Sequence, residues 1–245
     1  MKENQEFAAS YGQYCPLAMA AELLCNRWTM LVMREMLFGS TGFNEINRGV
    51  PLMSRTLLSR RLKEMQSYGL VRRVSANGGK RQEYQLTEAG KALGPVVLAM
   101  AEWGQAWIDV DPALRDIDVS FLMWDVRRGV KWSDDLPAQF VVQFIFPDAV
   151  EGKQQHWLVF EREDVDLCYV DPGREVDVYL EASLADFTRV WMGWDEIEKA
   201  VADRRLLIDG PPQITRRVRD WLGLSILAGI KKVHKDVRAL RSHPA

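Results

Sequence analysis

The sequence predicts an α+β protein built from two domains. Residues 1–111 show mainly helical periodicity with one short hairpin, whereas residues 112–245 show alternating strands first and helices afterwards. The helical pattern stops near Pro112, where a polar connector begins, so the domain boundary is placed between residues 111 and 112. Apolar residues make up 47% of the 245 residues, which is enough to form two cores.

The net charge of −2 conceals an uneven distribution along the chain. Residues 1–110 carry 13 Lys and Arg against 10 Asp and Glu, and residues 111–245 carry 19 against 24. Residues 27–81 alone carry 11 basic and three acidic side chains. Such a basic block indicates either a solvated surface or a surface that binds nucleic acid.

The three cysteines are Cys15, Cys25 and Cys168, which form no C-x-x-C pair and fit a reducing compartment. The first residues are charged and lack the apolar core of a signal peptide. No apolar stretch approaches the length of a membrane span. We therefore expect a cytoplasmic protein without a membrane partner.

The first half begins with three short helices, expected at residues 17–25, 28–37 and 43–50. Gly39 ends the second helix and Pro51 ends the third.

A fourth helix follows, and its two faces differ in character. Ser54 is a suitable N-cap, Gly69 closes the helix, and Leu58, Leu62 and Met65 form an apolar stripe for burial. The opposite face and the helix start present the polar and basic side chains that major-groove reading requires. These candidate DNA-binding residues are Ser54, Arg55, Thr56, Ser59, Arg60 and Lys63. Taken alone, the same pattern also fits an amphipathic surface helix.

A basic hairpin is expected directly after this helix, from strands at residues 70–74 and 83–86. Its Gly-rich tip, residues 76–81, carries Lys80 and Arg81. A hairpin in this place is a wing, and the two cations are expected over the minor groove or the adjacent backbone.

Thr87 caps a last helix of this half, expected to run to about Trp107. Its apolar stripe is either buried between two subunits or packed within one. The stripe consists of Val96, Met100, Trp103 and Trp107.

The order and spacing of these motifs resemble the HxlR-type winged helix-turn-helix transcription regulators, relatives of the MarR group, over residues 14–107. The matching pieces are Cys15-Pro16, Arg27-Trp28-Thr29, Phe43-Asn44-Glu45-Ile46, residues 57–62, Gly69-Leu70-Val71, residues 84–90 and Glu102-Trp103-Gly104. The resemblance implies a homodimer that binds double-stranded operator DNA, with the terminal helices pairing the two wings.

Cys15 is a candidate redox residue, because a thiol just before Pro16 at a helix start has a lowered pKa. The resemblance implies sensing of quinones or disulfide stress at this position in some family members. The alternative is a small buried residue inherited with the fold.

The second half follows the order of an α+β layer architecture. Strands are expected at residues 140–146, 156–162, 166–170, 176–181 and 206–208. Helices are expected within residues 112–135, at 183–191, at 194–204, and over a final stripe of Ile226, Ile230, Val233, Val237 and Leu240.

No catalytic or metal-binding constellation is found in the sequence. The histidines are His156, His234 and His243, without metal-ligand spacing, and no nucleophile or dinucleotide motif occurs. We expect neither an enzyme nor a cofactor or metal.

Residues 117–222 resemble the sterol-carrier-protein fold at the level of element order. The matching pieces are Phe146-Pro147-Asp148, residues 157–160, Asp171-Pro172-Gly173, residues 176–180 and residues 205–210. This resemblance implies a cavity for a hydrophobic small-molecule effector. The candidate lining residues, each of which is otherwise a core residue, are Phe140, Phe144, Phe187, Trp191, Met192 and Trp194.

Three hypotheses follow. The first is a homodimeric regulator that responds to a hydrophobic or aromatic ligand through residues 112–245. The second is a thiol-redox regulator that acts through Cys15, with the second half serving dimerisation. The third, a lipid carrier or enzyme tethered to DNA, lacks supporting chemistry in the sequence.

Overall fold

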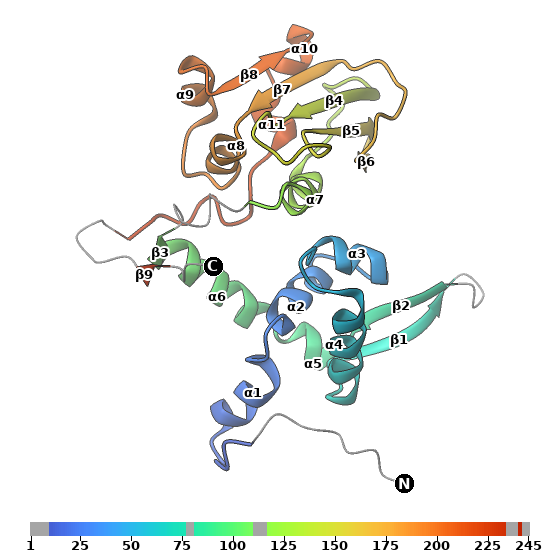
Figure 1. The fold of residues 1–245 in the computed structure, drawn as a ribbon, viewed down its shortest axis with the longest axis vertical. Coiled ribbons are helices and arrows are strands. Elements are labelled where there is room, and N and C mark those ends of the chain that lie inside the picture. The colour runs from blue at the N-terminus through green and yellow to red at the C-terminus, as the bar shows by residue number, and fades with distance from the viewer. Residues whose placement is uncertain (1–9, 77–80, 110–116, 234–239, 242–245) are drawn as a thin grey trace. The chain divides into compact units, whose positions relative to one another are not determined.

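The computed structural model describes residues 10–76, 81–109, 117–233 and 240–241 (Figure 1). The chain divides into two compact units, Met1–Ala99 and Met100–Ala245, here called the N-terminal and the C-terminal unit. The predicted domain boundary at residues 111 and 112 lies outside the described residues. Helices and a mixed sheet occur together in the chain, which confirms the α+β class.

The N-terminal unit begins with four helices, as predicted. They are α1 (Pro16–Leu24), α2 (Thr29–Leu37), α3 (Phe43–Arg48) and α4 (Arg55–Ser67). The last three surround a core that includes Val32, Met33, Ile46, Leu58 and Leu62, all with no exposed surface. In contrast, α1 buries none of its residues within the protomer.

A two-stranded antiparallel hairpin follows α4. Gly69, with φ of +72°, ends the helix in a conformation that favours glycine, and β1 (Val71–Ala76) starts two residues later. Strand β2 (Arg81–Leu86) pairs with it from Ala76↔Arg81 to Val71↔Leu86. Residues 77–80, which include Lys80, lie outside the described residues.

The prediction of one continuous helix from Thr87 to Trp107 was wrong, because the segment forms two separate helices. Thr87 caps the short helix α5 (Glu88–Lys91), and α6 (Gly94–Trp107) then starts anew. Pro95 explains the break, since it has no N–H for an intrahelical bond and its ring would clash with the carbonyl four residues earlier. Proline is tolerated only in the first turn, which is where α6 places it.

The C-terminal unit contains a five-stranded sheet in the order β6-β5-β4-β7-β8. Strands β4 and β7 are parallel neighbours, and the other neighbouring pairs are antiparallel. Each predicted strand is present, with bounds shifted by up to two residues. The strands are β4 (Gln139–Ile145), β5 (Gln155–Glu161), β6 (Asp164–Cys168), β7 (Val178–Ala182) and β8 (Leu206–Asp209).

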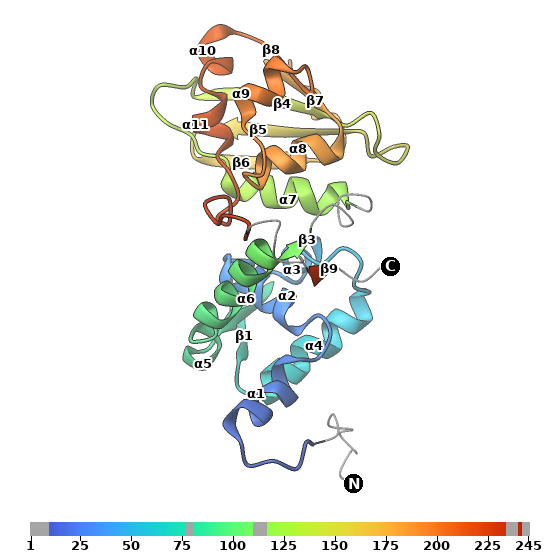
Figure 2. The same ribbon diagram turned by 90° about the vertical axis from the view of Figure 1, so that its left-hand side faces the viewer.

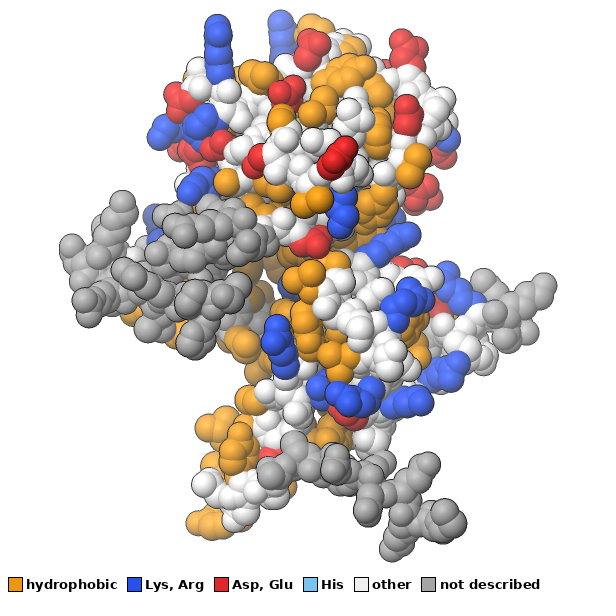
Figure 3. Space-filling model, viewed as in Figure 1, with side chains coloured by type: hydrophobic (Ala, Val, Ile, Leu, Met, Phe, Trp, Pro, Cys, Tyr) orange, Lys and Arg blue, Asp and Glu red, His pale blue; other side chains and the backbone are white. Residues whose placement is uncertain are grey.

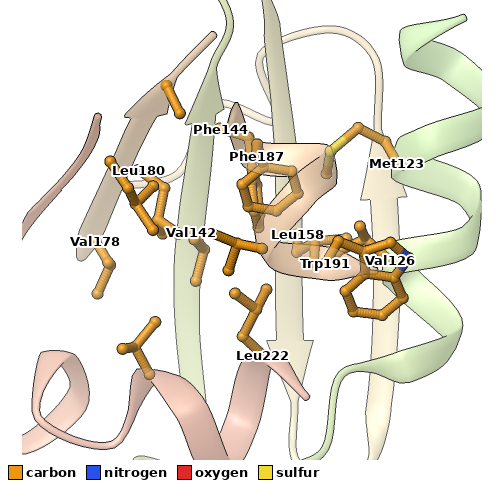
Figure 4. Close-up of a cluster of buried hydrophobic side chains, with 14 of the residues drawn as sticks. Met123, Val126, Val142, Phe144, Leu158, Val178, Leu180, Phe187, Trp191 and Leu222 are labelled. Atoms are coloured by element: carbon orange, nitrogen blue, oxygen red, sulfur yellow. The ribbon is translucent and has the colours of Figure 1, made fainter. Parts of the chain in front are cut away.

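Helices cover one face of this sheet (Figure 2). Phe187 and Trp191 of one helix meet inward side chains of β4, β5 and β7, among them Val142 and Leu158 (Figure 4). The result is two layers with one apolar core between them. The helices are α7 (Val119–Gly129), α8 (Leu184–Trp191), α9 (Ile197–Ala202), α10 (Pro212–Thr215) and α11 (Val218–Leu222).

The prediction of a final amphipathic helix from Ile226 to Leu240 was wrong for the described residues of this segment. Residues 223–233 contain turns and irregular chain, and Val237 lies outside the described residues. Gly223, with φ of +65°, ends α11, and Gly229 interrupts the apolar stripe with a poor helix former. The segment is instead hydrogen-bonded to the end of α6, where Val233 N donates to Ala106 O at 3.0 Å. Two short strands, β3 (Ile108–Asp109) and β9 (Leu240–Arg241), pair in parallel.

Candidate nucleic-acid interface

Helix α4 is anchored as its sequence predicted. The hydroxyl of Ser54 accepts a hydrogen bond from Leu57 N at 3.2 Å and so caps the first turn. Leu58, Leu62 and Met65 are buried, with at most 1% of each exposed. One face of the helix is therefore fixed in the core, and the opposite face is presented outward.

The outward face gathers the predicted DNA-binding side chains in one place. Five of them line a shallow surface hollow of about 470 Å³: Arg55, Thr56, Ser59, Arg60 and Lys63. Ser54 lies exposed at the start of the same helix. Figure 3 shows Lys and Arg side chains gathered over the part of the N-terminal unit that holds α4 and the hairpin. The basic side chains of the 13-residue helix α4 therefore form one continuous surface.

Arg55 is held in position by two residues of α3. Its Nη2 donates to Oδ1 of Asn44 at 2.8 Å, and its guanidinium lies 5.0 Å from the ring centroid of Phe43. The side chain is thus oriented before it meets a partner. Sequence reasoning missed this support, because it joins residues of two different helices.

The remaining basic residues of α4 differ in how they are engaged. Arg60 Nε lies 3.8 Å from Glu64, a loose pair one helical turn away, and its side chain remains 68% exposed. Arg61 is buried and pairs with Glu64, so it belongs to the helix support. Lys63 is exposed. Arg60 and Lys63 therefore keep most of their donors available to an outside partner.

The hairpin carries further cations along its described strands. Arg73 is exposed, and Arg72 donates to Gln85 across the hairpin at 3.1 Å. Arg81 is paired with Glu45 of α3 at 2.6 Å. The predicted DNA contacts of Lys80 and Arg81 stay predictions.

The carboxylate of Glu45 is the partner that holds Arg81. Partial burial alone would raise the pKa of Glu45, but hydrogen bonds from the Gly42 amide, the Arg81 guanidinium and the Thr41 amide outweigh it. The pKa of Glu45 therefore lies below its ordinary value, and the carboxylate stays charged.

Two helices present apolar side chains outward. On α6, the predicted stripe of Val96, Met100, Trp103 and Trp107 is 37% to 59% exposed in the protomer. On α1, Leu17 is 77% exposed. Leu24 at the end of α1 packs against the N-terminal core, but no residue of α1 is fully buried. The outward apolar side chains of both helices therefore remain largely exposed within the described part of the protomer.

Cys15 is exposed at the N-cap of α1, directly before Pro16. The backbone amides of Ala18 and Leu17 stabilise the thiolate, and they lower the pKa of the thiol below its usual range. This direction agrees with the expectation from the sequence, and the role of Cys15 as a redox residue stays a prediction.

The six candidate ligand-lining residues lie in or beside the packed core of the C-terminal unit. Phe140 stacks on Phe160 with ring centroids 4.1 Å apart, and Phe144 meets Phe187 edge-on at 5.6 Å. These residues and Trp191 are at most 2% exposed. The other two candidate lining residues, Met192 and Trp194, are half-buried.

A separate hollow of about 660 Å³ lies at another edge of this unit. Trp132 and Leu136 form part of its wall, and four exposed carboxylates surround them. Among the described residues, no group of three or more His, Cys, Asp or Glu side chains is arranged to hold a metal ion. No helix in the described ranges is both long enough and apolar enough to cross a membrane.

An anchored basic helix followed by an antiparallel hairpin defines the class of winged helix-turn-helix proteins. Residues 23–112 match the family model of the HxlR-like helix-turn-helix. The chain is 39% identical over 99 residues to the uncharacterized HTH-type transcriptional regulator YvaP of Bacillus subtilis, covering 40% of this chain and 92% of that protein. The chain therefore belongs to the HxlR-like helix-turn-helix family.

Other relatives match a similar share of the chain. An HTH-type transcriptional regulator of Methanothermobacter thermautotrophicus is 36% identical over 94 residues, covering 38% of this chain and 72% of that protein. The reduced form of the transcriptional regulator YodB from B. subtilis is 33% identical over 38% of this chain and 93% of its own, with a TM-score of 0.34. Most of the C-terminal unit lies outside the family match, and its likeness to sterol carrier proteins stays a prediction.

Proposed function

We propose that the chain is a homodimeric transcription regulator whose helix α4 reads operator DNA in the major groove. The observation that carries the proposal is the single exposed face formed by Arg55, Thr56, Ser59, Arg60 and Lys63 on a core-anchored helix. Membership in the HxlR-like family supports it.

Each side chain on this face has a chemical role. The planar guanidinium groups of Arg55 and Arg60 suit bidentate contacts to the edge of guanine. Thr56 and Ser59 are small, which permits close approach of the helix to the backbone. Lys63, together with Lys80 of the wing, supplies charge to phosphates.

The homodimer is proposed to form through the exposed apolar faces of α1 and α6. Leu17, Met100 and Trp103 are between 49% and 77% exposed in the protomer, and burial of such side chains drives association. Two copies related by a two-fold axis would present two α4 helices to a palindromic site.

The test begins with selection of bound sequences from a random duplex pool by the full-length protein. Arg55→Ala and Arg60→Ala are then expected to weaken binding to the selected duplex by roughly 1 to 3 kcal/mol each. Asn44→Ala is expected to act in the same direction, because Arg55 loses its positioning acceptor. Lys91→Ala, which removes a cation paired within α5, is the matched control. Equal affinity of wild type and the Arg55/Arg60 double variant rules out α4 as the reading helix.

Two signals are proposed to change the DNA affinity of the protein. In the first, the C-terminal unit binds a hydrophobic or aromatic effector and changes the arrangement of the DNA-reading helices in the dimer. Native mass spectrometry of the full-length protein tests this, since a co-purified apolar molecule supports it. If neither a co-purified molecule nor added apolar compounds alter DNA affinity, the effector proposal is refuted.

The second signal is oxidation or alkylation of Cys15, favoured by its exposure and by the lowered pKa of its thiol. Diamide treatment of wild type and of Cys15→Ser tests it by comparing DNA affinity before and after treatment. A response that persists in Cys15→Ser rules out this cysteine as the sensor.

A further inference from the structure

Arg81, the first residue of β2, is engaged by carboxylates of its own chain. Its Nη2 lies 2.6 Å from Oε1 of Glu45, and its Nε lies 3.7 Å from Oε1 of Glu83. A short charge-assisted hydrogen bond of this kind is among the stronger polar contacts of a protein surface. A phosphate would have to compete with Glu45 for the same guanidinium.

Glu45 connects the start of α3 with the end of β2 that lies next to the hairpin tip. Its Oε2 accepts hydrogen bonds from Gly42 N at 2.9 Å and from Thr41 N at 3.1 Å, which cap α3. Its Oε1 accepts from Arg81, 36 residues later in the chain. One carboxylate therefore holds two elements that the sequence keeps apart.

The main chain is also joined at this point. Tyr84 N of β2 donates to Thr41 O at 2.8 Å, and Gly42 forms an isolated bridge with Glu83. A Cβ at position 42 would lie 2.6 Å from Nη2 of Arg81, so glycine leaves the space in which the guanidinium sits. The side-chain pair and the backbone bonds together fix the hairpin against α3.

We propose that Glu45 is a positioning residue for the wing, which it holds against α3 through its ion pair with Arg81. Arg81 then acts within the protein and does not bind a phosphate. The inference rests on the proposed function, in which the hairpin lies against DNA. Because α3 also carries the residues that position Arg55, the hairpin and the reading helix share one support.

The test uses full-length Glu45→Gln, Arg81→Ala and the double variant with a DNA duplex of mixed sequence. Glutamine keeps an oxygen to cap α3 but removes the charge. We expect Glu45→Gln to weaken DNA binding by about three- to fivefold, the scale of one surface ion pair. The double variant should bind no more weakly than Arg81→Ala, because both changes break one interaction. Glu88→Gln, which breaks the Lys91 pair within α5, is the control and should not weaken binding.

The salt dependence separates a positioning role from a phosphate contact. A phosphate contact contributes about 0.9 to the slope of log K against log salt, so Arg81→Ala is expected to leave the slope unchanged. A slope that falls by about 0.9 overturns the proposal. Tighter or unchanged binding by Glu45→Gln also overturns it, since release of Arg81 from Glu45 would favour DNA if Arg81 met a phosphate.

Hydrogen exchange gives a readout that does not depend on DNA. In Glu45→Gln the amide of Tyr84 is expected to exchange several-fold faster while Tm stays close to that of wild type. Unchanged exchange overturns the positioning role. Faster exchange in a protein that binds no DNA supports the ion pair's structural role and contradicts the proposed function instead.

Discussion

The buried histidine of β5 is expected to make the C-terminal unit sensitive to acid. His156 is 1% exposed, its ring lies 5.5 Å from that of Tyr169, and its Nδ1 has no hydrogen-bond partner among the described residues. Burial lowers the pKa of His156 from 6.5 to about 4, and the charge of Lys153 adds to this effect. The carboxylate of Asp118 acts in the opposite direction and is outweighed.

The sign and size of the effect follow from proton linkage. The unfolded chain takes up the proton near pH 6.5, and the folded chain takes it up only near pH 4, so protonation favours unfolding between these values. The free energy of unfolding should therefore fall by roughly 3 kcal/mol across this window, from a shift worth about 1.4 kcal/mol per unit. Well above pH 6.5 both states are neutral at this site, and no loss is expected.

The assay is urea unfolding of wild type and His156→Leu, followed by tryptophan fluorescence at several pH values between 4 and 7. Leucine has a similar volume and carries no proton, and other groups that titrate in the window contribute equally to both proteins. The replaced side chain adds an offset that does not depend on pH, and from pH 7 to pH 4 the difference between the two curves is expected to shift by roughly 3 kcal/mol in favour of the variant. A difference that does not change with pH would refute the reasoning.

Three further predictions concern single positions. Gly129→Ala places a Cβ 2.1 Å from Cη2 of Trp191 and should lower the free energy of unfolding by about 2 to 3 kcal/mol. Gly104→Ala, whose Cβ has its nearest neighbour at 3.8 Å, should raise it by up to about 1 kcal/mol. Equal stability of the two variants in urea unfolding would contradict this. Ser54→Ala removes the cap of α4 and should cost about 1 kcal/mol, while Ser54→Asp should retain the cap; a stable Ser54→Ala would show that the hydroxyl is dispensable. Cys15 should react with iodoacetamide at neutral pH faster than a cysteine in a short peptide, with Cys15→Ser as the blank, and an equal rate would argue against its lowered pKa.

The parts of the fold that sequence reasoning found are those governed by neighbouring residues. The cap at Ser54 and the stripe of Leu58, Leu62 and Met65 are local features, and both are present. Pro95 was visible in the sequence, but the apolar periodicity that runs across it suggested one helix in place of two. The same periodicity predicted a helix from Ile226, where the chain bonds to Ala106 and Ile108 instead.

The details of the candidate interface depended on contacts between distant residues. Asn44 and Arg55 are 11 residues apart, and Glu45 and Arg81 are 36 apart. Their charges and polar groups were readable, but their pairing depends on how α3 packs beside α4 and β2. A single sequence offers no local signal for such a pairing.

The two proposed signals place different demands on the structure. Cys15 is exposed, so a reagent reaches its thiolate without any rearrangement of the protomer. An apolar effector that used Phe140, Phe144 and Phe187 would have to separate rings that now pack on one another. Opening such contacts costs about 0.5 to 1.5 kcal/mol for each aromatic pair, before any loss of burial is counted. The effector must offset this cost with its own buried surface, and its apparent affinity falls with the population of the open conformer. A ligand-responsive regulator of this design therefore requires a C-terminal unit that loosens before it binds, and slow, concentration-independent binding kinetics would be its signature.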